Sequence, residues 1–215
     1  KKLARGSTEG AREAHNDGTG VVIRWRDSLA DVPVDKDVPS VILAQEFFDC
    51  MPVKQFQYTE LGWCERMVEI DTSKNGPHHL RYVLSKGPTP SGQVLLNSEL
   101  VPKMPTKPEL NEGVEVSAEA FQMAQEIGRR VSVTGGAALV IDYGNDGPSA
   151  DSMQALKKHK KVHVLEDPGE CDVTAHVDFS AIKKAALDGS TEDATLAAAQ
   201  AAIAALGSSQ SPADR

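Results

Sequence analysis

Residues 39–53 read PSVILAQEFFDCMPV, a short apolar run followed at once by two acids. Four apolar residues bounded by turn-forming residues predict a fully buried β-strand, here residues 40–45. Glu46 and Asp49 come directly after this strand, among aromatic and apolar side chains. Acids are poor packing residues, whereas ligands of open α/β sheets bind outside the carboxyl ends of the strands. We therefore expect a functional site at the end of this strand.

A second apolar run of the same form lies far along the chain. Residues 137–141 read AALVI and predict another buried strand, which delivers Asp142 and Tyr143 at its carboxyl end. A helix is predicted before it, with Ser117 as its N-cap, an apolar stripe at helical spacing, and the glycines at 135–136 as its end. Strand, crossover helix and strand form a βαβ unit, so the two strands are expected to run parallel.

The crossover contains an insertion of different character. Apolar and polar residues alternate over residues 53–84, and an Asn-Gly turn signal interrupts them at 75–76. This pattern predicts a three-stranded antiparallel meander with one polar face. Residues 85–113 are rich in proline and have no clear period, so we expect a long surface connection there.

The remaining segments carry weaker signals. We expect the tail of a helix and a loop over 1–19, a short strand at 21–23, mostly loop and short helix over 145–180, and an Ala-rich helix over 181–206. Residues 207–215 are small and polar, which is typical of a disordered tail. The predicted division of the chain is a partial core at 1–52, the β insertion with its connecting loop at 53–113, the remainder of the core at 114–186, and the Ala-rich helix with its tail at 187–215.

The composition narrows the class of partner. The chain has 215 residues and a formal net charge of −8, whereas nucleic-acid and anionic-membrane surfaces need concentrated Lys and Arg. No apolar run reaches the length of a membrane span, so we expect neither a nucleic-acid partner nor membrane insertion. Three cysteines without metal-ligand spacing indicate a reducing compartment, or thiols with no special role. The first residues form neither a signal peptide nor a full transit peptide, and we expect the sequence to begin within a longer chain.

Four motifs, each weak alone, occur in an order and at a spacing that resemble one known family. They are EFFDCMPV at 46–53, GWCERMV at 62–68, GGAALVIDYG at 135–144 and DVTAHVDF at 172–179. Together they resemble the MidA family, the mitochondrial complex I assembly factor 7 type of S-adenosylmethionine-dependent methyltransferase. The resemblance covers most of the chain and leaves out its two ends.

The resemblance implies an α/β, Rossmann-like class I methyltransferase fold, incomplete here, with the antiparallel β meander inserted. It implies S-adenosyl-L-methionine as the cofactor and a protein as the substrate. Eukaryotic members are held to form symmetric dimethylarginine on a core subunit of respiratory complex I during its assembly. The implied location is the mitochondrial matrix, or the cytoplasm for a bacterial member.

The sequence departs from the family pattern at the cofactor. The family's glycine-rich strand-to-helix loop, and the acid after its second strand, are expected upstream of Lys1. At position 45, where the family usually carries Asn or His, this chain has Gln45. The chain is then either a fragment of a methyltransferase or a degenerate relative. A non-catalytic assembly or interaction module is the alternative function.

The candidate catalytic residues are Glu46, Asp49 and His176. Carboxylates at the end of the strand at 40–45 would hold an arginine guanidinium by bidentate, charge-assisted hydrogen bonds and accept the proton that leaves as nitrogen attacks. His176 could take that proton if its segment faces the acids. The alternatives are a helix cap for Asp49 and a structural histidine paired with Asp172 or Asp178.

The other candidates line the pocket or hold the cofactor. Asp142 and Tyr143 lie one strand over from Glu46, and with Asp178 they are the candidate substrate-pocket residues. The resemblance assigns the cofactor to Asp27, Ser28 and Gln45, with the acid binding the adenine amino group; an exposed loop acid is the alternative for Asp27.

Two further patterns bear on other kinds of chemistry. The adjacent histidines at 78–79 adjoin an Asn-Gly-Pro turn and have no further ligands spaced nearby, so we expect no metal site. A hydrolase using Asp49 and His176 is disfavoured, because the sequence lacks a Gly-x-Ser-x-Gly motif and Cys50 has no basic neighbour.

Overall fold

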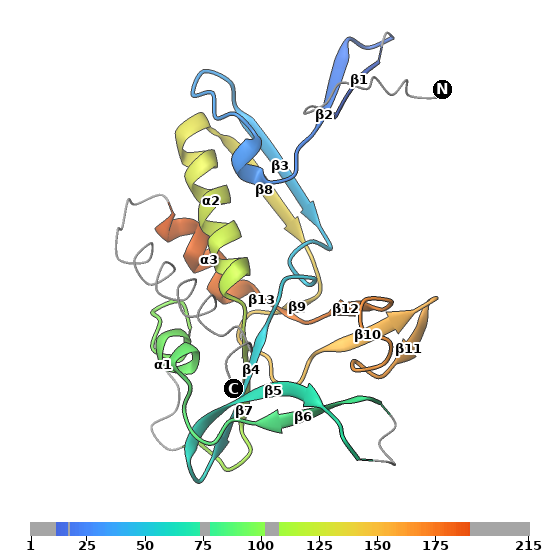
Figure 1. The fold of residues 1–215 in the computed structure, drawn as a ribbon. Helices are drawn as coiled ribbons and strands as arrows, with labels where there is room; N and C mark the ends of the chain where they lie inside the picture. The colour runs from blue at the N-terminus through green and yellow to red at the C-terminus, as the bar shows by residue number, and fades with distance from the viewer. Residues whose placement is uncertain (1–11, 17, 74–77, 102–107, 190–215) are drawn as a thin grey trace, which may run out of the picture.

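The computed structural model describes residues 12–16, 18–73, 78–101 and 108–189. In Figure 1 the parallel strands β3 (Ser40–Gln45) and β8 (Gly136–Ile141) lie along helix α2 (Ala118–Thr134). An antiparallel sheet of β6 (Leu80–Leu84), β5 (Gly62–Ile70), β4 (Lys54–Thr59) and β7 (Gly113–Val116), in that order, lies at the opposite end of the structure in this view. The turn after β3 leads into β4 (Lys54–Thr59), so the acidic stretch lies where the two parts join.

The predicted βαβ unit is confirmed. β3 and β8 pair in parallel from Ser40 opposite Gly136 to Gln45 opposite Ile141. The Ser117 side chain caps α2 by accepting a hydrogen bond from the Ala120 N–H. Gly136 has a φ of 107°, and a Cβ atom there would lie 2.0 Å from the Ser40 carbonyl oxygen. The close approach of the two strands therefore requires glycine at this position.

The inserted meander is confirmed and is larger than predicted. β4, β5 (Gly62–Ile70) and β6 (Leu80–Leu84) form it, and β7 (Gly113–Val116) adds a fourth strand beside β4. The long connection predicted for 85–113 is wrong in part, because it contains α1 (Pro90–Leu96) as well as the start of β7. α1 has only seven residues, too few to show a period; a Thr89 cap and a proline in its first turn define its start.

Several short strands replace segments that were predicted to be irregular or helical. β1 (Arg12–Asn16) and β2 (Val21–Trp25) form a hairpin, which corrects the predicted helix tail and loop over residues 1–19; residues 1–11 lie outside the described part. Residues 145–180 contain no helix before Phe179. Their strands are β9 (Gly144–Asn145), β10 (Gln154–Lys157), β11 (Lys160–Val162), β12 (Asp172–Thr174) and β13 (Val177–Asp178). Strands of two to four residues are too short to carry a readable alternation.

The C-terminal helix α3 (Phe179–Asp188) packs against α2. The approach is close, since a Cβ atom on Gly128 of α2 would lie 1.9 Å from the Ala186 carbonyl oxygen. The predicted helix over 181–206 is confirmed as far as Asp188. Its remainder, and the predicted tail at 207–215, lie outside the described residues.

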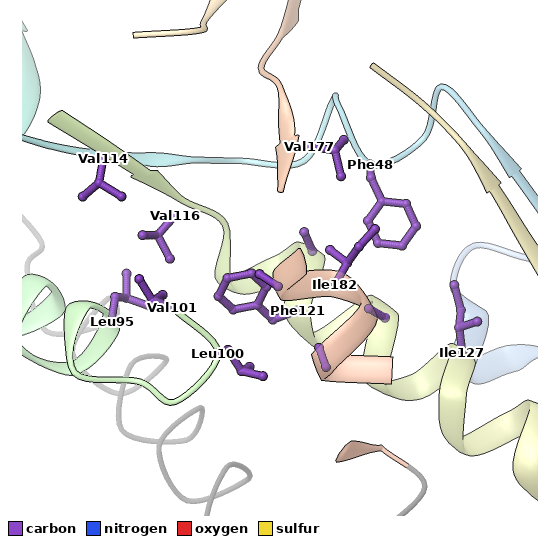
Figure 2. Packing of buried hydrophobic residues seen from close by; sticks show 14 of the residues in the cluster. Phe48, Leu95, Leu100, Val101, Val114, Val116, Phe121, Ile127, Val177 and Ile182 are labelled. Carbon is purple, nitrogen blue, oxygen red and sulfur yellow. The ribbon is translucent and has the colours of Figure 1, made fainter. Parts of the chain in front are cut away.

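One apolar cluster holds these parts together. Figure 2 shows buried side chains from α2, α3, β7 and the turn after β3 gathered in it, among them Phe48, Phe121, Val116 and Ile182. Phe48 thus anchors the turn that carries the two predicted acids.

The prediction that both strands of the parallel pair are fully buried is wrong. Val41, Leu43 and Leu139 are 85%, 64% and 57% exposed, whereas Ile42, Ala44 and Val140 pack against the core cluster. The physical reason is that helices cover one face of the pair within the described residues, whereas a parallel sheet is ordinarily covered on both faces. Among the described residues, no helix is both long and apolar enough to cross a membrane.

Candidate functional site

An acid at the end of β8 holds the turn at the end of β3. The Oδ2 atom of Asp142 accepts hydrogen bonds from the backbone N–H groups of Phe47 (3.0 Å), Phe48 (2.8 Å) and Asp49 (3.3 Å). Its Oδ1 atom accepts one from the Tyr143 N–H at 2.8 Å. Hydrogen bonds to an ionised acceptor are strong, so this carboxylate fixes the shape of the turn. The role predicted for Asp142 in the substrate pocket stays a prediction beside this structural one.

Glu46 is the first residue of the turn and has an uncommon backbone conformation. Its N–H donates to the Ile141 carbonyl at 2.8 Å, and its φ is 45°. A non-glycine residue in the left-handed region costs free energy and persists only where the surroundings impose it. The anchored turn imposes it here and leaves the Glu46 side chain exposed at the strand end.

Asp49 lies deeper, with a relative exposure of 8%. Burial raises the pKa of its carboxyl above the ordinary value, and the charges of Asp142, Glu46 and Asp172 raise it further. A hydrogen bond from the Cys50 N–H acts in the opposite direction and lowers the pKa. The cap of a helix, the alternative for Asp49, does not occur, because no helix begins within residues 50–53.

The segment around His176 lies against the same turn. The Ala175 N–H donates to the Asp49 carbonyl at 2.9 Å, and the Val177 N–H donates to the Tyr143 carbonyl at 2.9 Å. Between them, the His176 side chain is exposed. The structure therefore places the backbone of His176 beside the turn that carries Glu46 and Asp49, and its role as a proton acceptor stays a prediction.

Asp178, Tyr143 and Gln45 complete the strand ends. Asp178 caps α3, since its Oδ1 atom accepts hydrogen bonds from the Ala181 N–H at 3.0 Å and the Ser180 hydroxyl at 2.8 Å. Tyr143 and Gln45 both have exposed side chains. The proposed pocket contacts of Asp178 and Tyr143 and the cofactor contact of Gln45 stay predictions.

Asp27 and Ser28 lie elsewhere. The Ser28 hydroxyl donates to the Asp31 carboxylate at 2.9 Å, at the start of the short helix η1 (Leu29–Asp31). The Arg130 guanidinium, near the end of α2, donates to the Leu29 carbonyl at 2.7 Å. Because α2 ends where β3 and β8 begin, η1 lies toward the amino ends of the strands. These two residues are thus not brought to the acids.

The charges of Glu46, Asp142 and Asp172 all act on the carboxyl group of Asp49, and we call these four residues the acidic edge. Such a concentration of negative charge favours a cationic ligand. Within the described residues, no group of three or more His, Cys, Asp or Glu side chains is arranged to hold a metal ion.

A separate cavity of about 940 Å³ lies between the inserted sheet, α1 and α3. Tyr58, Trp63 and Lys184 are among the residues that line it, and the rings of Tyr58 and Trp63 have centroids 5.5 Å apart. None of the predicted site residues lines this cavity.

The sequence analysis did not identify Glu115 and Ser152, which hold the His176 segment through its backbone N–H group. Ser152 accepts a hydrogen bond from the His176 N–H at 2.8 Å and donates to Glu115. The signal that could have found Glu115 is its place between Val114 and Val116, since an acid in an otherwise apolar strand needs a partner. Nothing in the sequence distinguishes Ser152.

The family model described as "Putative S-adenosyl-L-methionine-dependent methyltransferase" matches residues 4–195. Among curated proteins, "Protein arginine methyltransferase NDUFAF7, mitochondrial" of Danio rerio is 42% identical over 170 residues, which cover 79% of this chain and 37% of that protein. The protein of the same name in Homo sapiens is 39% identical over 168 residues, or 78% of this chain and 35% of that protein. The chain thus spans about a third of the length of the curated relatives it matches.

Solved structures show the same fold at low sequence identity. A COG1565 superfamily member from Burkholderia thailandensis, bound to S-adenosyl-homocysteine, matches with a TM-score of 0.56 and 22% identity, over 77% of this chain and 40% of that one. A native crystal structure of a COG1565 superfamily protein from the same organism matches with a TM-score of 0.56 and 23% identity, over 89% of this chain and 50% of that one. The predicted α/β methyltransferase fold is confirmed.

Proposed function

The chain belongs to the S-adenosyl-L-methionine-dependent methyltransferase family whose model it matches, and we propose that it forms the substrate side of an enzyme that methylates arginine in a protein. The observation that carries this proposal is the acidic edge at the carboxyl ends of the parallel strands β3 and β8. Ligands of open α/β sheets bind at these ends, and a guanidinium is the cation that carboxylates bind most specifically.

Two carboxylates of the edge suit two different tasks. Glu46 is exposed and its backbone is fixed by a hydrogen bond to Ile141, so its carboxylate is accessible to a guanidinium at the strand end. Asp49 is buried, and its raised pKa makes it a better proton acceptor than an ordinary aspartate. S-adenosyl-L-methionine supplies the electrophilic methyl group when it is bound. The arginine nitrogen that takes the methyl group must lose a proton, and Asp49 is the group proposed to receive it, with His176 as the route to solvent.

The acidic edge fits the positive charges of this reaction better than the anionic parts of the cofactor. A guanidinium and a sulfonium are both cations, whereas the methionine carboxylate would be repelled by four acids. Gln45, neutral and exposed at the end of β3, is the predicted cofactor residue that lies at this edge. Asp27 and Ser28 lie toward the other ends of the strands, which makes them the weaker of the predicted cofactor contacts.

The finer features of the function rest on the relatives. We propose symmetric dimethylation of an arginine on a core subunit of respiratory complex I, in the mitochondrial matrix. The names of the curated relatives support arginine, a protein substrate and a mitochondrial location. The complex I subunit and the symmetric product come from the resemblance of the four motifs.

The test uses the protein encoded by the complete reading frame that contains residues 1–215. Calorimetry measures binding of S-adenosyl-L-methionine, and tritiated cofactor with an extract enriched in complex I measures transfer. Hydrolysis of the labelled protein is expected to release methylated arginine, with the symmetric dimethyl form dominant. Transfer to lysine or to carboxylates instead would overturn the proposal. Capture of a complex I subunit with no methyl transfer would support the non-catalytic assembly module.

A further inference from the structure

Three consecutive residues beside the acidic edge are held from two sides. The N–H groups of Ala175 and Val177 donate to the carbonyls of Asp49 and Tyr143, each at 2.9 Å, which ties the segment to the βαβ unit. The N–H of His176, between them, donates to the Ser152 hydroxyl oxygen at 2.8 Å. Because neighbouring N–H groups of an extended chain point in opposite directions, this third bond fixes the other side of the segment.

The Ser152 hydroxyl is itself held by a buried acid. Glu115, 7% exposed on β7 of the inserted sheet, accepts hydrogen bonds from both the Ser152 hydroxyl and the Ser152 N–H, the latter at 2.9 Å. The Gln55 side-chain amide donates to the same carboxylate at 2.7 Å. An ionised carboxylate only accepts hydrogen bonds, so the serine hydroxyl must donate to it and turn a lone pair toward His176. The orientation of the hydroxyl is thus set by Glu115.

We propose that Glu115 is a positioning residue of the methyltransferase site, acting through Ser152 to hold residues 175–177 against Asp49. The inserted sheet thereby contributes to the site although none of its residues belongs to the acidic edge. This inference rests on the proposed function, in which Asp49 and His176 handle the proton of the substrate. A loosened segment would withdraw His176 from Asp49.

A second buried acid of the same sheet supplies a matched comparison. Glu65 on β5 is also 7% exposed and accepts a serine hydroxyl, that of Ser91, at 2.6 Å. Its other partners are Lys54 and Thr89, at 2.6 Å each, and both lie within the insertion. Glu65 therefore stabilises the insertion internally, whereas the chain of contacts from Glu115 leads out of it to the acidic edge.

The test compares Ser152→Ala with Ser152→Thr, which keeps the hydroxyl, and with the control Ser91→Ala, in the complete reading frame. Hydrogen–deuterium exchange resolved to single amides reports the His176 N–H. Ser152→Ala and Glu115→Ala are expected to speed its exchange about tenfold, the usual worth of one hydrogen bond, and to lower kcat for methyl transfer about tenfold with little change in KM. Ser152→Thr is expected to restore both, and Ser91→Ala to alter neither.

The outcomes separate this inference from the proposed function. Unchanged exchange at His176 in Ser152→Ala overturns the inference, whether or not the protein transfers methyl groups. Faster exchange with an unchanged kcat also overturns it. If the unaltered protein transfers no methyl group, the proposed function fails, and the exchange rates alone decide whether Glu115 holds the segment. Should Glu115→Ala fail to fold, Ser152→Ala carries the test.

Discussion

The Oδ2 atom of Asp142 lies 2.8 Å from the backbone nitrogen of Phe48, so an acid of one strand holds the turn that follows its neighbour. This contact joins two segments 94 residues apart. It places Glu46 and Asp49 at the end of a parallel strand pair, where the chemistry proposed for them requires them to be.

Asp142→Asn tests whether this contact shapes the acidic edge. The neutral amide accepts fewer and weaker hydrogen bonds than the carboxylate does, so the free energy of unfolding is expected to fall by about 1–3 kcal/mol. Urea denaturation measures it, and amide exchange at Phe47 and Phe48 should speed up. Asp146→Asn is the control, because Asp146 pairs with Lys183 on the surface, and exposed ion pairs contribute little. Equal effects of the two changes would contradict the role given to Asp142.

Asp49→Asn is expected to stabilise the fold at neutral pH while lowering activity. The pKa of Asp49 is raised above 3.8 in the folded protein, chiefly by burial, so the folded state favours the protonated carboxyl. The contribution of Asp49 to the free energy of unfolding is therefore fully present below pH 3.8 and is lost as the pH rises through the raised pKa. The neutral amide avoids this loss, and the advantage of the variant should shrink as the pH falls toward 3.8.

Urea denaturation of both proteins across that pH range measures the effect. Asp37→Asn, in the exposed loop before β3, is the control. The rate of methyl transfer by Asp49→Asn should fall about 100-fold, as is common when a general base is removed. If Asp49→Asn were less stable than the original protein at pH 7 and more stable than it in acid, the pKa of Asp49 would be lowered in the folded protein, contrary to the prediction.

Glu46→Gln and Glu46→Gly separate the charge of this residue from its backbone. Both remove a carboxylate proposed to bind guanidinium, and KM for the arginine substrate is expected to rise about 10- to 100-fold. The φ of 45° suits glycine, so Glu46→Gly should equal or exceed the original protein in stability despite its loss of function. Steady-state kinetics and urea denaturation check the two expectations. An unchanged KM in both variants would remove Glu46 from the site.

Gly136→Ala tests the parallel pairing of β3 with β8. The added Cβ atom would lie 2.0 Å from the Ser40 carbonyl oxygen, so the strands must separate. Gly135→Ala is the matched control: its φ is also positive, at 70°, but its added Cβ atom would meet nothing within 4 Å beyond its own chain neighbours. Backbone strain alone is expected to cost about 1–3 kcal/mol at Gly135, and Gly136→Ala should cost clearly more in the free energy of unfolding. Similar losses of stability in the two variants would show that the contact between Gly136 and Ser40 does not limit the approach of β3 and β8.

The sequence predicts the βαβ unit and the meander because their signals are local. The Ser117 cap and the two glycines at 135–136 mark the ends of one helix, and alternation over 53–84 marks three strands. Glu46 and Asp142 each follow the last residue of a predicted strand. Because the two strands are predicted to run parallel, the sequence also predicts that these two acids lie beside each other.

The parts that were missed depend on contacts between distant segments. The two-residue strands β9 and β13 exist only because they pair with each other, and the exposure of Val41 depends on what covers its face of the sheet. Likewise, the capping role of Asp178 and the relay from Glu115 to Ser152 need the folded arrangement. The residue type of an acid does not show whether it binds a substrate or accepts a hydrogen bond from a backbone N–H.

The central claim is that the acidic edge serves arginine methylation. The most direct measurement is the rate of methyl transfer from tritiated S-adenosyl-L-methionine to arginine in a complex I-enriched extract, by the complete protein and by the double variant Glu46→Gln/Asp49→Asn. The expected result is labelled methylarginine with the original protein and a fall of at least about 100-fold in the double variant, with cofactor binding retained. Equal transfer by both proteins, or cofactor binding without any methylarginine, would contradict the claim.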